Sequence, residues 1–275
     1  MPRWVWDYVR ATSGDGGYAE VRGWKYEVVG PRYNARPFMT DVCSPCPTRR
    51  DVFLRRVLGV NVDSELLALG RAVHEAFLYP FKLRGRGLEA IVYEFKKLLK
   101  NLKGVERYRS FLYEVFKKGL TLAAISEEEQ IPLSIEPRVP GAVIGLSDYV
   151  RPDILLGFIP VDVVLSSNGD GLGRKEVALA GYSLAVEAWT GHPVDVGIVI
   201  SIPLSKAVRV VWRVVRIDDP LRRRFIELRD DVARMLEYNE EPERPSSCNQ
   251  GCPYRSVCWG EGDLHLKPLW QASSS

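Results

Sequence analysis

Long apolar runs are missing from this sequence of 275 residues, and histidine and cysteine are scarce, with three and five residues. No stretch of about 18 apolar residues occurs, which argues against a membrane-spanning helix. The opening residues, MPRWVWDYVR, carry aromatic and charged side chains where a signal peptide needs an apolar run. We therefore expect a cytoplasmic protein without membrane contact, in which clustered cysteines indicate metal or redox chemistry rather than disulfides.

The bulk composition is that of a globular chain. Hydrophobic residues make up 46% and charged residues 27%, with a formal net charge of +3 and a pI of about 8.5. This length and apolar content are sufficient to bury a core. The slight basic bias is compatible with nucleic-acid binding but is not evidence for it.

The pattern of apolar residues predicts an α/β protein with a mixed sheet. Helices are expected over residues 48–59, 64–80, 87–102, 105–125, 174–191 and 218–241. Strands are expected over residues 133–139, 142–150, 154–165, 194–202 and 207–217. A loop is expected at 166–173, and Gly157 is expected to supply a turn within 154–165. We divide the chain into an irregular lead-in (1–45), a helical region (46–131), an α/β core (132–240) and a cysteine-rich tail (241–275).

The cysteines are the most distinctive feature of the sequence. Cys248, Cys252 and Cys258 form a C-x3-C-x5-C triad, and a fourth thiolate is available from Cys43 or Cys46. Four thiolates suit an iron–sulfur cluster. Zinc accepts the same ligands but usually takes two close pairs, and ordinary buried cysteines are a third interpretation. Such a site would join segments about two hundred residues apart and should stabilise the fold strongly.

Six segments together resemble a known family. They are CPTRRDVFLRR at Cys46, GRAVHEAF at His74, GLSDYV at Asp148, PVDVV at Asp162, LAGYSLAVE around Tyr182, and the C-terminal triad. In this order they resemble RecB-like nucleases of the CRISPR-associated exonuclease family, and within it the archaeal subtype I-A group called Csa-one.

The resemblance implies a PD-(D/E)xK (RecB-like) nuclease core, preceded by a helical region and followed by an iron–sulfur segment. It implies that Cys46 rather than Cys43 completes the cluster with the triad, and it favours [4Fe–4S] over [2Fe–2S]. The implied activity is that of a DNA exonuclease, dependent on Mg²⁺ or Mn²⁺, that acts on single strands in CRISPR spacer acquisition. The implied partners are DNA and the CRISPR integration proteins.

The resemblance also implies the site residues His74, Asp148, Asp162 and Tyr182, and we add Lys175 as a candidate for the lysine of the family motif. The first three would bind the metal, which polarises the phosphate and lowers the pKa of the attacking water. We expect Asp148 and Asp162 on adjacent strands of a hairpin, with His74 reaching in from a helix.

Each of these residues also has a simpler interpretation. His74 could be a packed histidine and Asp148 could merely end a strand. Asp162 interrupts an apolar strand, and a buried carboxylate needs a partner or a metal. Asp153 is a rival to Asp148 because Pro152-Asp153 spells the first half of the motif, but the resemblance favours Asp148, whose distance to Asp162 and preceding GLS match the family pattern better.

One departure from the family pattern leaves two functions open. The lysine expected two residues after Asp162 is replaced by Val164, and the glutamine expected before Tyr182 is replaced by Ala178. Lys175 could replace that lysine from the next helix. The alternative to an active enzyme is a catalytically impaired subunit that binds DNA or docks onto the CRISPR adaptation complex.

Two arginine-rich clusters are candidate DNA contacts, and the one beside Cys46 is the stronger candidate. Their members are Arg49, Arg50, Arg55 and Arg56, and Arg222, Arg223 and Arg224.

Overall fold

The computed structural model describes residues 3, 7, 19–166, 172–248 and 251–260. Parts of the expected lead-in (1–45), loop (166–173) and tail (241–275) lie outside these residues. Its helices are α2 (Tyr26–Val29), α3 (Met39–Val42), α4 (Arg50–Arg56), α5 (Glu65–Lys82), α6 (Leu88–Asn101), α7 (Arg109–Glu128), α8 (Leu172–Thr190), α9 (Asp219–Tyr238), α10 (Arg255–Trp259) and the 3-10 helices Glu106–Tyr108 and Ala142–Ile144. Its strands are β1 (Leu133–Ile135), β2 (Val139–Pro140), β3 (Tyr149–Val150), β4 (Ile154–Leu156), β5 (Ile159–Ser166), β6 (Val196–Pro203) and β7 (Val211–Arg216).

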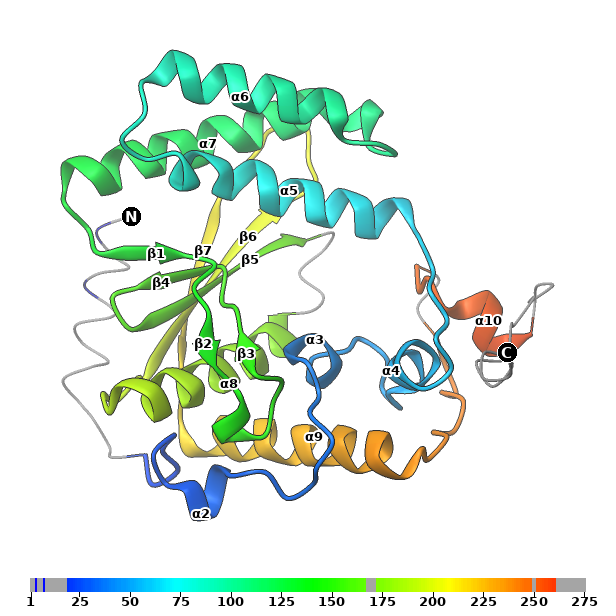
Figure 1. Cartoon of the computed structure of the whole chain (residues 1–275). Coiled ribbons are helices and arrows are strands. Elements are labelled where there is room, and N and C mark those ends of the chain that lie inside the picture. Colours follow the sequence, from blue (N-terminus) through cyan, green and yellow to red (C-terminus); the bar gives the residue numbers. More distant parts are fainter. Residues whose placement is uncertain (1–2, 4–6, 8–18, 167–171, 249–250, 261–275) are drawn as a thin grey trace, which may run out of the picture.

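The expected mixed α/β architecture is confirmed. Five strands form one sheet in the order β1-β4-β5-β6-β7, in which β5 and β6 are parallel and the other neighbours antiparallel. Helix α8 is the crossover that a parallel β5–β6 pair requires. Figure 1 shows α5, α6 and α7 on one side of the sheet and α8 and α9 on the other. None of the helices in the described part of the chain is long and apolar enough to span a membrane.

Each face of the sheet has its own apolar core. Val161 and Val163 of β5 pack with α5 and α7, whereas Val199 of β6 packs with α8 and α9. β6 reads as a continuous apolar run because both of its faces are covered. Gly181 of α8 allows Phe225 of α9 to approach closely, since an added Cβ would lie 2.4 Å from that ring.

A buried ion network fastens the segment before α2 to α8 and α9. The Glu187 carboxylate is fully buried and accepts hydrogen bonds from Arg22, Arg222 and the Gly23 amide at 2.7 to 3.0 Å. Arg222 is itself fully buried, so the expectation that it contacts DNA is wrong. A run of arginines usually indicates exposed side chains, but the Arg222 side chain pairs with the buried carboxylate of Glu187.

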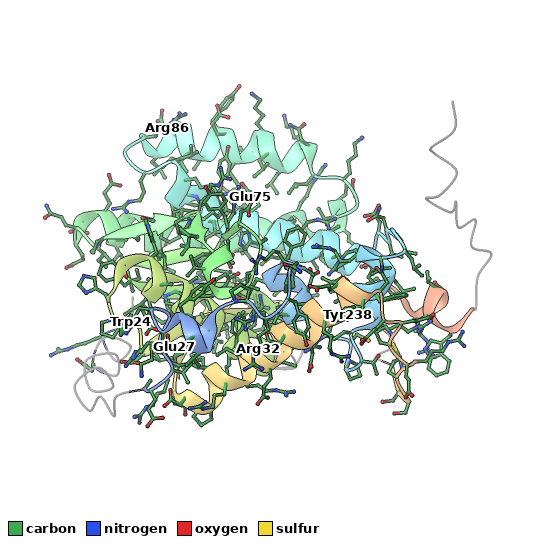
Figure 2. All side chains as sticks on the ribbon, turned by 60° about the horizontal axis from the view of Figure 1, so that its bottom comes forward. Trp24, Glu27, Arg32, Glu75, Arg86 and Tyr238 are labelled. Atoms are coloured by element: carbon green, nitrogen blue, oxygen red, sulfur yellow. The ribbon has the colours of Figure 1, made fainter. Side chains whose placement is uncertain are left out.

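The lead-in follows this face of the molecule further. Figure 2 turns the face forward, with Trp24, Glu27 and Arg32 along the segment and Tyr238 at the end of α9. The Tyr33 ring meets the Tyr238 ring edge-on, with centroids 6.3 Å apart. The described part of the lead-in therefore packs against the helices that follow the sheet.

The expected strand at 142–150 is wrong. Ala142–Ile144 forms a 3-10 helix that ends at Gly145, whose φ of +74° reverses the chain. Only Tyr149–Val150 is extended, and it pairs with β2 in a separate two-stranded sheet. The turn at Gly145 breaks the strand that the alternating apolar pattern predicts. The position at which the next strand begins then decides which acidic residue reaches the site.

Candidate active site

Two carboxylates meet where β4 separates from β5. The register pairs Ile154 with Val161, so Asp153 lies opposite Asp162. The residue before Asp153 is a proline, which lacks an N–H and cannot extend the ladder. The Asp153 carboxylate pairs with β5 in another way, because its Oδ2 accepts a hydrogen bond of 2.6 Å from the Val163 amide. The rival aspartate is therefore the one beside Asp162.

His74 reaches this point from α5, as expected. Its Nε2 lies 2.6 Å from Asp153 Oδ1, and its helix neighbours Val73 and Phe77 are fully buried in the core. Burial favours the neutral ring, but the hydrogen bond and charge of Asp153 outweigh it and raise the pKa of His74. The packed helix and the carboxylate together fix the orientation of the imidazole.

Asp162 is a buried carboxylate, with 4% of the residue exposed. Burial raises its pKa to about 6, and the nearby charge of Asp153 adds to that rise while Lys175 opposes it. The Lys175 ammonium lies 2.5 Å from Asp162 Oδ2 as an ion pair, although this oxygen has no well-directed hydrogen bond. A buried carboxylate oxygen without a well-directed hydrogen bond is suited to binding a cation.

Helix α8 supplies the ammonium group that β5 lacks. Val164 lies on the same face of β5 as Asp162, since strand side chains alternate, and it packs against the apolar core beneath α8. Lys175 and Tyr182 are seven residues apart, so they share one face of the helix with Ala178 between them. Tyr182 is buried, and this burial together with the Asp162 charge raises its pKa well above the ordinary value. The Tyr182 hydroxyl therefore stays protonated at neutral pH.

Asp148 does not lie where the sequence predicts. It is exposed and precedes β3, which belongs to the two-stranded sheet, so the expectation of a strand adjacent to Asp162 is wrong. Its carbonyl accepts a hydrogen bond of 2.9 Å from the Gly141 amide. The structure brings together His74, Asp162 and Lys175 from the predicted set, with Asp153 in the place assigned to Asp148.

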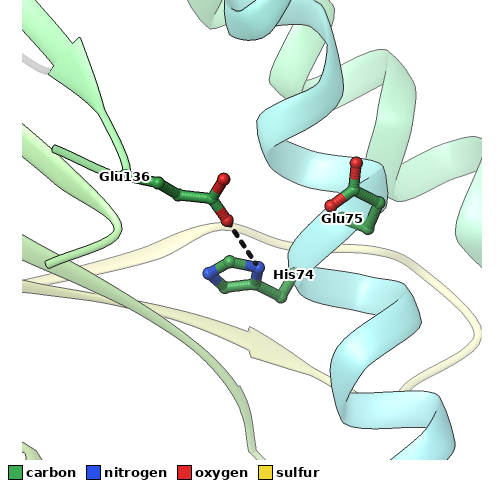
Figure 3. Close-up of side chains that lie close together, drawn as sticks. All are labelled: His74, Glu75 and Glu136. Carbon is green, nitrogen blue, oxygen red and sulfur yellow. Dashed lines mark ion pairs between the residues drawn. The ribbon is translucent and has the colours of Figure 1, made fainter. Parts of the chain in front are cut away.

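Three charged residues that the sequence did not single out surround His74. Figure 3 shows His74 and Glu75 on α5 facing Glu136, which follows β1. The imidazole and the two carboxylates offer ligand atoms that all lie within 4.8 Å of one another. The Lys82 ammonium lies 2.9 Å from a carboxylate oxygen of each glutamate, so a cation of the protein itself bridges the pair. Glu136 sits opposite Asp153 by strand register, which no local pattern reveals.

The cysteine segments approach each other around α4. Cys252 and Cys258 pack with Leu54 at the end of α4 and with Val60 beyond it. Burial, followed by the neighbouring Cys248, raises the pKa of the Cys252 thiol to about 11. No three cysteine sulfurs within the described ranges lie as close as 4.8 Å. The ligands of an iron–sulfur cluster lie further apart than those of a single ion, so this spacing bears on a single metal ion and not on a cluster.

Cys43 and Cys46 lie in different surroundings. Cys43 packs against the α8–α9 core, and burial, followed by the Asp162 charge, raises its pKa to about 12. The Cys46 Sγ lies 3.5 Å from the Thr48 hydroxyl, just before α4. The two thiols therefore have different surroundings. Cys43 lies near the Asp162 carboxylate, whereas Cys46 lies just before α4, on which Cys252 and Cys258 pack.

Most of the first arginine cluster is engaged within the protein. Arg55 and Arg56 both pair with the fully buried Asp41, at 2.6 and 3.0 Å. Arg50 donates to the carboxylate of Glu241. Arg49 is the member that makes no ion pair among the described residues, and it holds two backbone carbonyls instead.

Comparison with known proteins places these features in a family. The model of the family described as CRISPR-associated exonuclease Csa1 matches residues 1–124 and 88–261. The CRISPR-associated exonuclease Csa1 of Thermoproteus tenax is 27% identical over 256 residues, covering 87% of this chain and 90% of that protein. Its namesake from Saccharolobus solfataricus is 25% identical over 268 residues, covering 87% and 91%. The solved alkaline exonuclease of Laribacter hongkongensis has a TM-score of 0.36 and 12% identity, covering 78% of this chain and 92% of that one.

Proposed function

The chain belongs to the CRISPR-associated exonuclease Csa1 family, and on that premise we propose that it is a metal-dependent exonuclease acting on single-stranded DNA. The observation that carries the proposal is the convergence of Asp153, Asp162 and His74 from three separate elements. Two carboxylates and an imidazole form a donor set suited to Mn²⁺ or Mg²⁺. A bound divalent ion would polarise the scissile phosphate and lower the pKa of the attacking water.

The residues of this chain have distinct tasks in the proposed reaction. Asp153 holds the His74 ring by its Nε2 and is itself fixed by the Val163 amide. Lys175 keeps Asp162 ionised at neutral pH by opposing the effect of burial. Its ammonium also offers positive charge to a phosphate beside that carboxylate. Val164 is the feature that favours a non-catalytic subunit, and the ammonium of Lys175 supports the enzyme instead.

The activity is tested with end-labelled single-stranded DNA and Mn²⁺. Wild-type protein should shorten the DNA from an end, and Asp162→Ala should not. Equal degradation by both proteins would mean a contaminating nuclease. No degradation by either would favour the non-catalytic alternative, in which the fold binds DNA and docks onto CRISPR integration proteins.

We further propose a [4Fe–4S] cluster held by Cys46, Cys248, Cys252 and Cys258. Support comes from the packing of Cys252 and Cys258 on α4, directly after Cys46, and from the separate location of Cys43. Purified protein should be brown and contain iron, whereas a zinc protein would be colourless. Cys46→Ser should lose the visible absorption and the matched variant Cys43→Ser should keep it. The reverse result would make Cys43 the ligand.

A trimming exonuclease of this family would act in CRISPR spacer acquisition together with the integration proteins. Co-purification of the wild-type protein with those integration proteins would test this partnership. Dilution into high salt should dissociate the complex.

A further inference from the structure

A groove of about 720 Å³ lies beside the candidate active site. Its walls are the segment before α4, the start of α8 and one face of α9. We call it the α8–α9 groove and define it by Pro47, Arg49, Arg174, Arg224, Leu228 and Met235. Three of these six residues are arginines and three are apolar.

The arginines of the groove lack strong acidic partners. Arg174 is exposed and makes no ion pair with any residue that the structure describes. Arg49 donates to the carbonyls of Ser44 and Cys46, both at 2.8 Å, and its buried Nε has no hydrogen-bond partner. Arg224 reaches Glu227 only at 3.6 Å, with both side chains more than half exposed. Positive charge is therefore available for a ligand.

These cations are close to one another and to the carboxylates. Burial lowers the pKa of Arg49, and the positive charge of Arg224 lowers it further, so two like charges share one end of the groove. Arg174 lines the groove and directly precedes Lys175 in the first turn of α8, and Lys175 pairs with Asp162. The groove thus continues directly from the site where Lys175 meets Asp162.

Three acidic residues also line the groove, and one of them, Asp231, lies two turns along α9 from Arg224. The other two follow the end of α9, where Glu240 pairs with Arg234 and Glu241 pairs with Arg50. Arg224 lies in the first half of α9, roughly 16 Å along the helix from Met235 at about 1.5 Å per residue. The positive end of the groove is therefore the end that adjoins α8.

We propose that the α8–α9 groove binds the strand phosphate next to the scissile one, with Arg174 and Arg224 as contacting residues. This inference rests on the proposed nuclease function and specifies how its substrate is held. A groove of this volume is large enough to admit a nucleotide. Pro47, Leu228 and Met235 offer apolar surface to a base, while the arginines meet the backbone. The first turn of the nineteen-residue helix α8 also lines this end of the groove through Gly173 and Arg174, and a helix amino terminus favours a phosphate.

The test measures binding separately from cleavage. A fluorescent single-stranded oligonucleotide is titrated with wild-type protein, Arg174→Gln, Arg224→Gln and Arg223→Gln, without added divalent cation, at several salt concentrations. Arg223 is the matched control, because it neighbours Arg224 on α9, is similarly exposed and does not line the groove. Arg174→Gln and Arg224→Gln should each weaken binding several-fold and lower the salt slope by about 0.7. Arg223→Gln should leave both quantities close to wild type.

Two results would overturn the inference. One is equal binding by all four proteins, and the other is equal weakening in all three variants, since either would leave the groove without a special role. The same preparations are then assayed with Mn²⁺. Groove-dependent binding without cleavage would overturn the nuclease function and leave the groove assignment in place. Cleavage together with binding that does not depend on the groove would overturn the groove assignment and leave the nuclease function in place.

Discussion

Replacing Asp162 with asparagine should stabilise the protein at pH 8 although it abolishes cleavage. The wild-type carboxylate is buried beside Asp153, and its pKa is raised from 3.8 to about 6 even with Lys175 opposite it. A neutral amide of the same shape avoids the cost of burying the charge. Lys175 keeps 32% of its side chain exposed, so water can solvate its ammonium once the partner charge is gone.

The size of the effect follows from the raised pKa. Below pH 3.8 the carboxyl is neutral in both the folded and the unfolded state. As the pH rises toward 6, the unfolded chain releases this proton while the folded chain retains it, so the free energy of unfolding falls. The difference corresponds to about 3 kcal/mol, and roughly half of it is already present at pH 5. Well above pH 6 the decrease in the free energy of unfolding stays constant.

Urea unfolding of wild type and Asp162→Asn, followed by far-ultraviolet circular dichroism without divalent cation, measures this difference. The variant should be more stable at pH 8, and its advantage should grow by roughly 1.5 kcal/mol between pH 5 and pH 8. The comparison with wild type removes most contributions from other groups that titrate in this range. An advantage that does not change with pH, or a variant less stable at pH 8, would refute the assignment of a buried, charged carboxylate.

Three further predictions concern the groups around this centre. Lys175→Gln should lower kcat for DNA cleavage by about 100-fold, measured by single-turnover kinetics, and should lower the melting temperature in calorimetry, because Asp162 is left buried without its counter-charge. Glu187→Gln should destabilise the protein by about 3 to 5 kcal/mol in urea unfolding, because the buried Arg222 and Arg22 then share Asp195 as their one remaining carboxylate partner. Cys252→Ser should remove the visible absorption and lower the melting temperature, and an unchanged melting curve would contradict a cluster that joins distant segments.

The long helices could be predicted because their signals are local. Ser64 caps α5 by accepting a hydrogen bond from the Leu67 amide, and Asp218 caps α9 with a proline in the first turn. The hairpin of β4 and β5 was equally visible, since Gly157 takes the left-handed conformation that its turn requires. Each signal lies within a few residues of the element that it predicts.

The composition of the site was less predictable because it depends on strand register. The choice between Asp148 and Asp153 rests on where β4 begins, and the turn at Gly145 interrupts the strand that was expected to carry Asp148. Glu136 enters through the pairing of β1 with β4, and Lys82 enters through the packing of α5. These are relations between segments that are distant in the sequence, and no local pattern encodes them.

Lys175, in contrast to these residues, could be identified from the sequence. The absence of the motif lysine from β5 was plain at Val164, and Lys175 was identified as a replacement from its place at the start of the next helix. The structure brings its ammonium to Asp162, because the first turns of α8 pass over the face of β5 that carries the carboxylate. The catalytic role of Lys175 remains a prediction.

The measurement that tests the central claim most directly compares two aspartates in one assay. Wild type, Asp153→Asn and Asp148→Asn are incubated with end-labelled single-stranded DNA and Mn²⁺, and the initial rate of cleavage is recorded. The account predicts that Asp153→Asn loses at least about 100-fold in rate, because it removes a proposed metal ligand that also orients His74. Asp148→Asn should retain most of the activity. An inactive Asp148→Asn beside an active Asp153→Asn would contradict the account.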